Sequence, residues 1–164
     1  MGKPKLNCEV RGYKVYDARK RCRWKRVKGL KLELLVIEAL RRMGLLEQFR
    51  WCPNGRVDFI WDCYNWEFEL KNLEKTEYVT IPWLFSEVVS RFSDDAERKV
   101  LVVTKSCWNA VADVFLEMKG IDVIEVGSIR RKRFYERAIR RFEEGFLELV
   151  RKAAAEKVMV HERN

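Results

Sequence analysis

The sequence predicts a mixed α/β fold, with a central β-sheet of mixed strand direction, flanking helices and a long helix at the C-terminal end. The first observation is an amphipathic stripe over residues 30–43, followed by three short strand-like runs separated by turn signals. The second is a helix–strand–helix–strand order over residues 81–126. The third is an apolar stripe of helical period from residue 129 to about residue 158. Helices that alternate with strands cover the faces of a sheet, which is the α/β arrangement.

The length and composition favour a single domain. The 164 residues, 48% of them hydrophobic, suffice to bury a core. No apolar run reaches the roughly 18 residues of a membrane-spanning helix. The basic start, residues 1–5, lacks the apolar stretch of a signal peptide. We therefore expect a cytoplasmic protein that does not enter a membrane.

The first helix is predicted over residues 30–43. Its apolar residues recur at helical spacing and form one stripe: Leu32, Leu35, Val36, Ala39, Leu40 and Met43. Gly44 follows, where a C-terminal cap belongs.

Three strands are predicted over residues 46–52, 56–62 and 66–71. The Pro-Asn-Gly turn at 53–55 separates the first two, and the turn at 63–65 separates the second from the third. Turns this short join antiparallel strands, so we expect a meander.

The following segment predicts a β-α-β unit. Pro82 suits the first turn of a helix that extends to residue 92. The apolar run at 99–104 is typical of a strand buried on both faces. We then expect a helix over 107–119, with Ser106 as its N-cap, and a last strand over 121–126 that pairs in parallel.

The long helix predicted from residue 129 has two interpretations. Its apolar stripe can pack on the protein's own core, or it can form the seam of a homodimer. We divide the chain into a basic arm over residues 1–27, a core over residues 28–128 and the long helix over residues 129–164.

The positive charge lies almost entirely at the N-terminal end. The net charge is +9, and residues 1–31 hold twelve Lys and Arg residues but only two acids, which leaves the rest of the chain at −1. This pattern favours a polyanion such as nucleic acid, with a solubilising tail or a membrane-surface contact as alternatives. The basic residues that we expect to contact phosphates are Arg23, Lys25, Arg26, Lys28, Lys31 and Lys75.

Cysteine and histidine usage argues against several kinds of site. The five cysteines include no pair at C-x-x-C spacing, and the single histidine is His161. A structural zinc site is therefore poorly supported, as is a histidine-assisted nucleophile. We expect the cysteines to be buried free thiols in a reducing compartment.

A carboxylate-rich pair of strands marks the candidate site. Asp58 lies on the second predicted strand, and Glu67, Glu69 and Lys71 alternate along one face of the third. Carboxylates beside an ammonium are what a Mg²⁺-dependent phosphodiesterase needs, because Mg²⁺ prefers oxygen ligands and retains several waters. We expect Asp58 and Glu69 to be ligands, and Glu67 to flank the site or to be solvated.

The spacing of Asp58 and the Glu69-Leu70-Lys71 tripeptide, within this order of elements, resembles the PD-(D/E)XK nuclease superfamily, which has the restriction-endonuclease-like fold. The likeness covers roughly residues 28–126. The segments at 26–33, 51–55 and 79–82 are similar to stretches of archaeal Holliday-junction resolvases. Val57 stands where the motif has proline.

The resemblance implies an endonuclease that hydrolyses phosphodiester bonds in DNA, including branched or junction DNA, with Mg²⁺ or Mn²⁺. It implies catalytic roles for Asp58, Glu69 and Lys71. It also implies that Glu33 on the first helix and the Leu70 carbonyl join Asp58 and Glu69 around the metal. The alternative is a non-catalytic DNA- or RNA-binding protein with a nuclease-like fold.

Overall fold

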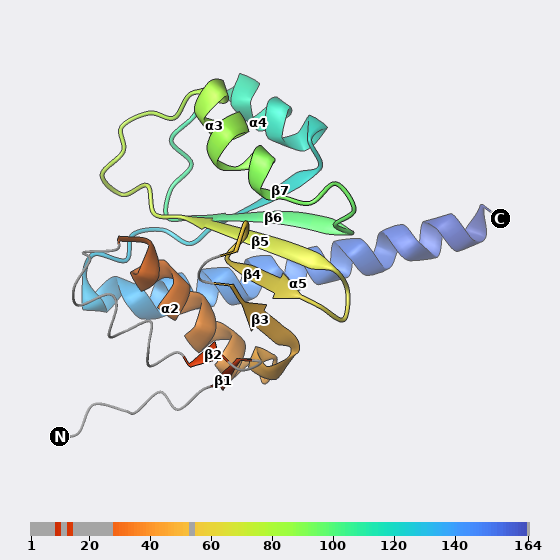
Figure 1. Cartoon of the computed structure of the whole chain (residues 1–164), viewed down its shortest axis with the longest axis horizontal. Coiled ribbons are helices and arrows are strands. Elements are labelled where there is room, and N and C mark those ends of the chain that lie inside the picture. Colours follow the sequence, from red (N-terminus) through yellow and green to blue (C-terminus); the bar gives the residue numbers. More distant parts are fainter. Residues whose placement is uncertain (1–8, 11–12, 15–27, 53–54, 164) are drawn as a thin grey trace.

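A computed structural model describes residues 9–10, 13–14, 28–52 and 55–163 (Figure 1). These residues form a five-stranded mixed sheet in the order β3-β4-β5-β6-β7, with helices on both faces. The predicted mixed α/β class, with its long C-terminal helix, is confirmed.

Two very short strands, β1 (Glu9–Val10) and β2 (Tyr13–Lys14), pair antiparallel near β3. The remainder of the predicted basic arm lies outside the described residues.

Helix α2 (Lys28–Arg42) closely matches the predicted first helix. Its apolar stripe is buried, including Leu32, Leu35 and Leu40, which are fully covered. After the helix, Gly44 adopts φ +71° and the N–H of Leu45 donates to the Leu40 carbonyl at 2.9 Å. This is the left-handed cap predicted from the sequence, because a side chain is strained at that φ.

The meander is real, but its first two strands are shorter than predicted. Residues Leu46–Gln48 form a 3₁₀ turn, η1, before β3 (Phe49–Trp51), and β4 covers only Phe59–Trp61. Both pairings in the series β3, β4 and β5 (Trp66–Lys71) are antiparallel. The difference arises because Leu46 is buried through the 3₁₀ turn, so its apolar character does not require a strand.

The second half contains the predicted parallel unit. Strand β6 (Arg98–Val103) pairs in parallel with β5 and with β7 (Ile121–Glu125), and helix α4 (Ala110–Met118) connects β6 to β7. The predicted N-cap of α4 is wrong. The Asn109 side chain caps the helix by accepting from the N–H of Ala112 at 3.0 Å, whereas the hydroxyl of Ser106 donates to Glu125.

The helix predicted up to residue 92 stops earlier. Helix α3 covers Ile81–Glu87 and a 3₁₀ turn, η2, covers Val89–Arg91. Val88 joins the two with φ −124° and ψ −67°, and it is fully buried. The helix is interrupted because Val88 and Phe92 are both buried in the core on this face of the sheet. This packing outweighs the preference for a continuous helix.

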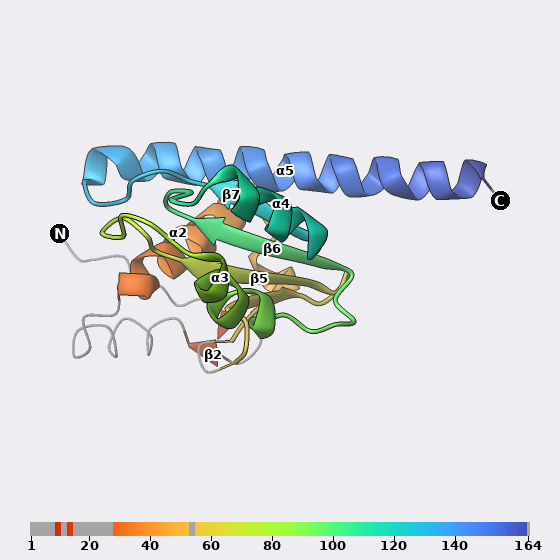
Figure 2. The same cartoon turned by 90° about the horizontal axis from the view of Figure 1, so that it is seen from above.

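The sheet separates two layers, which Figure 2 shows from above. Helices α2 and α5 (Lys132–Glu162) cover one face, and α3 and α4 cover the other. Strand β6 contributes to both cores, because Val100 and Val102 point to the first and Leu101 and Val103 to the second. This confirms the prediction of a strand buried on both faces.

Helix α5 begins three residues later than predicted and extends beyond the sheet at its C-terminal end (Figures 1 and 2). Its first half packs on α2 and β7 through the buried Ala138, Ile139, Phe142 and Phe146. At Gly145 an added Cβ would stand 2.9 Å from Cγ2 of Ile124, so glycine permits the close approach of α5 to β7.

None of the helices within the described residues is long and apolar enough to span a membrane. The described cysteines, Cys52, Cys63 and Cys107, are free thiols as expected. The expectation that they are buried is wrong, because Cys52 and Cys107 are half-buried and Cys63 is exposed in the turn between β4 and β5.

Candidate functional site

The candidate site forms at the N-terminal end of β4 and the C-terminal half of β5, and helix α2 contributes one residue to it. Asp58 directly precedes β4, and its N–H still donates to the Phe68 carbonyl of β5 at 3.0 Å. Glu69 and Lys71 lie on β5, and Glu33 lies on α2. The fold thus brings together all four side chains that the sequence singled out, although Glu33 and Glu69 are 36 positions apart in the chain.

A backbone N–H holds the Asp58 carboxylate. The N–H of Leu70 donates to Asp58 Oδ2 at 2.7 Å. In an extended strand the N–H and C=O of one residue point to the same side. The Leu70 carbonyl therefore points to the side of β5 on which Asp58 lies. This is the direction that it needs to share a metal ion with Asp58.

Glu69 is almost fully buried, with 4% of its surface exposed. Its Oε1 is 2.9 Å from the Lys71 ammonium, while its Oε2 is buried and has no hydrogen-bond partner among the described residues. A buried carboxylate oxygen with no donor costs free energy, so it is an unused ligand position. The Lys71 ammonium also lies 6.0 Å from the ring centroid of Trp83.

Glu33 completes the cluster from the helix side. The indole N–H of Trp51 donates to Glu33 Oε2 at 2.9 Å, and the Glu33 carboxyl is in hydrogen-bond contact with Asp58. Two carboxyls in contact cannot both be ionised cheaply, so they share a proton. Burial, reinforced by the Asp58 charge, raises the pKa of Glu33 to about 8.

The other two acids are perturbed in the same direction. Burial, followed by the charge of Asp58, raises the pKa of Glu69 to about 7, although Lys71 opposes the shift. Burial also raises the pKa of Asp58, against the Leu70 N–H and the charge of Lys71. Three carboxyls, one buried and two half-buried, face only the charges of Lys71 and Arg91, which do not bring their pKa values down to the ordinary range.

The donor set fits a hard divalent cation. Glu33, Asp58 and Glu69 offer only oxygen atoms, one of them unpartnered, and a cation would offset the burial and the charge repulsion that raise the pKa values of Glu33 and Glu69. Within the described part of the chain, no three acidic, histidine or cysteine side chains are arranged as a metal site. All three acids hold other partners, since Glu33 accepts from Trp51, Asp58 accepts from the Leu70 N–H and Glu69 pairs with Lys71.

The basic residues predicted to contact phosphates are only partly within the described part of the chain. Lys31 and Lys75 are exposed, and the Lys31 ammonium donates to the Arg130 carbonyl at 3.3 Å. Lys28 begins α2. The other three, Arg23, Lys25 and Arg26, lie outside the described residues.

Glu67 is not solvated, so this part of the prediction is wrong. It is buried with 5% of its surface exposed, and its Oε1 accepts from the N–H of Ser93 at 2.7 Å. Its carboxylate therefore anchors the segment that follows η2. The alternation along β5 correctly indicated its face but not the loop that covers this face.

Two neighbours of the site were not predicted. Arg91 on η2 contributes a positive charge that lowers the pKa values of Asp58 and Glu69. Trp51 on β3 holds Glu33. No local pattern indicates Arg91, whereas the alternation of β3 could have placed Trp51 on the face beneath α2.

Comparisons of the chain with protein-family models, with curated proteins and with solved structures each give no match. The interpretation of the site therefore depends on its own residues and geometry.

Proposed function

We propose that the protein is a Mg²⁺-dependent endonuclease that hydrolyses phosphodiester bonds in DNA. The observation that carries the proposal is the convergence of Glu33, Asp58, Glu69 and Lys71, which come from α2, the start of β4 and β5. Their types match the resemblance to PD-(D/E)XK nucleases. Mn²⁺ is the alternative metal.

The arrangement of elements supports a restriction-endonuclease-like fold. A helix leads into an antiparallel meander, and a parallel pair of strands completes the sheet. The acidic residues lie directly before the second strand of that sheet, on its third strand and on the helix that precedes it. Val57, which stands in place of the motif's proline, is buried in the second core.

The residues of the site have distinct tasks. Glu33, Asp58 and Glu69, with the Leu70 carbonyl, would hold Mg²⁺, which lowers the pKa of a bound water and neutralises charge on a phosphate. Lys71, fixed by Glu69 at 2.9 Å, orients the water and stabilises negative charge on the phosphate oxygens. Trp51 and Leu70 keep the acids in position through their N–H groups.

Branched DNA is the substrate shape that the resemblance to resolvases favours, and a homodimer in the cytoplasm remains part of the proposal. Sedimentation equilibrium of the full chain measures the oligomeric state. Comparing four-way-junction DNA with linear duplex of the same sequence tests the substrate shape.

The test of the activity is cleavage of supercoiled and four-way-junction DNA with Mg²⁺ or Mn²⁺. Asp58→Asn, Glu69→Gln and Lys71→Met are each expected to reduce cleavage by a factor on the order of 10² to 10⁴, because each removes a ligand or charge from the reacting phosphate. Glu67→Gln is the matched control for Glu69→Gln, since it replaces a glutamate by glutamine two positions away on β5. Circular dichroism establishes that the variants are folded. Cleavage that survives all three substitutions would contradict the assignment.

The second candidate is a DNA- or RNA-binding protein without catalysis. The surplus of ten positive charges in residues 1–31 favours it. It predicts binding with a steep dependence on salt and no dependence on Mg²⁺. A competition assay between single-stranded RNA and duplex DNA distinguishes a DNA-binding protein from an RNA-binding protein.

A further inference from the structure

The N-terminal part of α5 and the loop before it carry a dense positive charge. Residues 130–141 contain seven Lys and Arg residues and one acid, Glu136. That acid is neutralised from the neighbouring helix, since Arg42 of α2 binds its carboxylate at 2.6 Å. We call six of these residues the basic stripe: Arg130, Arg131, Lys132, Arg133, Arg137 and Arg140.

The basic stripe faces solvent. All six residues are exposed, whereas Ala138, Ile139 and Phe142 on the opposite side of the helix are fully buried. Among the described residues, only Arg130 of the stripe approaches an acid within salt-bridge range, with Nε 3.9 Å from Glu74 Oε2. Arg133 and Arg137 flank the ring of Phe134 at 4.7 and 5.1 Å from its centroid.

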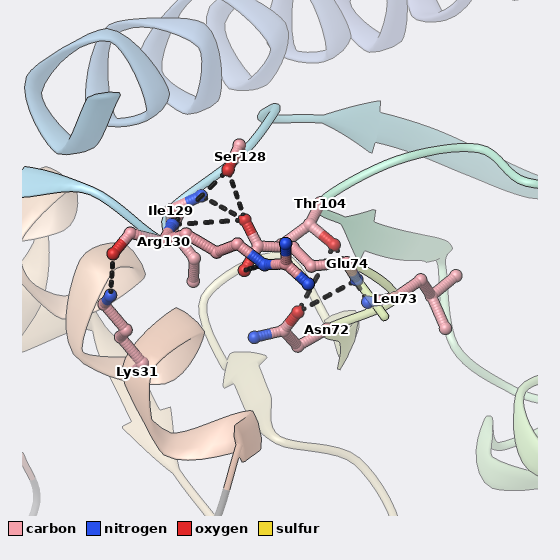
Figure 3. A network of polar contacts seen from close by, with 8 residues as sticks. All are labelled: Lys31, Asn72, Leu73, Glu74, Thr104, Ser128, Ile129 and Arg130. Atoms are coloured by element: carbon pink, nitrogen blue, oxygen red, sulfur yellow. Dashed lines mark hydrogen bonds and ion pairs between the residues drawn. The ribbon is translucent and has the colours of Figure 1, made fainter. Parts of the chain in front are cut away.

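A network around Glu74 holds the start of the stripe in place (Figure 3). Oε1 of Glu74 accepts from the hydroxyl of Ser128 at 2.6 Å, from the N–H of Ile129 at 2.5 Å and from the N–H of Arg130 at 3.2 Å. Lys31 of α2 adds a bond to the Arg130 carbonyl. The loop between β7 and α5, on which the basic stripe begins, is therefore fixed to the segment after β5 and to α2.

The same network places the start of the stripe, Arg130, near the candidate site. Glu74 follows Lys71 by three residues, which span at most about 11 Å. Figures 1 and 2 both show the start of α5 at the end of the molecule where β5 and β6 finish. From Lys132 to Arg140 the helix rises about 12 Å, which matches the axial rise of three to four phosphates along one DNA strand.

We propose that the basic stripe is a second contact surface that binds the phosphate backbone of duplex DNA outside the cleavage site. The proposal rests on the proposed function for its substrate. Five of the six residues are arginine, whose planar guanidinium pairs with phosphate through two hydrogen bonds. A membrane surface fits less well, because the apolar side of this part of α5 is buried in the core and offers nothing to insert.

The experiment measures binding without cleavage. Fluorescence anisotropy of a labelled duplex is recorded in EDTA over a series of salt concentrations with the full chain. The variant R133A/R137A/R140A is compared with R151A/K157A/R163A, which removes three exposed charges from the other end of the same helix. Alanine favours a helix, and thermal melting establishes that both variants are folded.

The stripe variant is expected to bind roughly tenfold more weakly, and the slope of log K against log salt is expected to fall by about 3. Equal affinity and slope for the two variants would overturn the proposal. The proposal would also be overturned if polyglutamate or anionic vesicles displaced the labelled duplex as strongly as unlabelled duplex does.

A cleavage assay with Mg²⁺ separates this proposal from the proposed function. If the wild type cuts DNA and the stripe variant binds as the wild type does, only the stripe proposal fails. If the wild type never cuts but the stripe variant loses binding, only the nuclease proposal fails. If both proposals hold, the stripe variant has a raised KM and an unchanged kcat at saturating DNA.

Discussion

At the scale of single residues, the site is defined by an imbalance of charge. Glu69 is buried beside the half-buried Glu33 and Asp58, and the Lys71 ammonium pairs with Glu69. Lost hydration raises all three pKa values, and the charge of Asp58 raises those of Glu33 and Glu69 further. The fold maintains this costly cluster through Trp51 and the Leu70 N–H, which is typical of a binding site rather than of a structural ion pair.

The raised pKa of Glu33 predicts a dependence of stability on pH. Folding raises this pKa from 4.5 to about 8, so its protonated form favours the folded state. The contribution is complete below about pH 4.5 and is lost as the pH rises through about 8. Glu33→Gln stays neutral at every pH and retains an acceptor for Trp51. In EDTA at pH 9, the free energy of unfolding of this variant is expected to be about 2 kcal/mol higher than that of the wild type.

Urea unfolding at pH 4.5, 7 and 9 measures this difference, which should vanish at the lowest pH. Glu38→Gln on the same helix is the control. The Glu38 pKa is lowered by Arg41, so this variant should gain nothing at pH 9. If the free energies of unfolding of the wild type and of Glu33→Gln changed with pH by the same amount, Glu33 would be ionised in the folded protein and the prediction would fail.

At the scale of elements, the ends of helices decide where each functional segment begins. Helix α5 starts at Lys132 because the N–H groups of Ile129 and Arg130 are held by Glu74 and not by a helical turn. Helix α4 starts after Asn109, whose side chain satisfies the N–H of Ala112. Such bonds compensate the donors that a helix leaves unpaired at its first turn.

The cap of α4 gives a direct test. Asn109→Ala is expected to lower the free energy of unfolding by about 1 kcal/mol, because the Ala112 N–H loses its acceptor. Ser106→Ala is expected to change it by less than about 0.5 kcal/mol, since its hydroxyl makes one exposed bond to Glu125. Chemical denaturation of both variants measures the two effects. Equal losses would show that the helix starts earlier than Ala110.

At the scale of the whole molecule, the candidate site joins parts that are far apart in the chain. Helix α2, the start of β4 and strand β5 each supply an acid, and Glu74 extends the connection to α5. A ligand that binds several elements at once stabilises the folded state by mass action.

The corresponding prediction concerns Mg²⁺. At about a hundredfold excess over Kd, it is expected to stabilise the folded protein by roughly 2–3 kcal/mol. The effect should be larger at pH 8.5 than at pH 6, because Mg²⁺ must displace protons from acids whose pKa values are about 8 and about 7. Thermal melting with Mg²⁺, against KCl of equal ionic strength, measures the stabilisation. Glu69→Gln should abolish most of it, and an equal response from this variant would place the metal elsewhere.

The sequence by itself determined the elements whose side-chain pattern is set by burial. The stripe of α2, the alternation of β5 and the apolar run of β6 each appear at almost the predicted positions. Local periodicity suffices there because the core selects one face of a helix or strand, and a shift by one residue would expose it. The same patterns indicated Asp58, Glu69 and Lys71, the antiparallel meander and the parallel pair, but not the pairing of β5 with β6 that joins them into one sheet.

Only the tertiary structure decided which partner each of these groups has. The contact of Trp51 with Glu33, the burial of Glu67 against Ser93 and the Glu74 network all join segments at least 18 positions apart. The break at Val88 and the late start of α5 likewise follow from contacts with other elements. Burial and electrostatic repulsion depend on separation in space, which local sequence periodicity does not encode, so the pKa values and the pinned basic stripe emerge only in the folded chain.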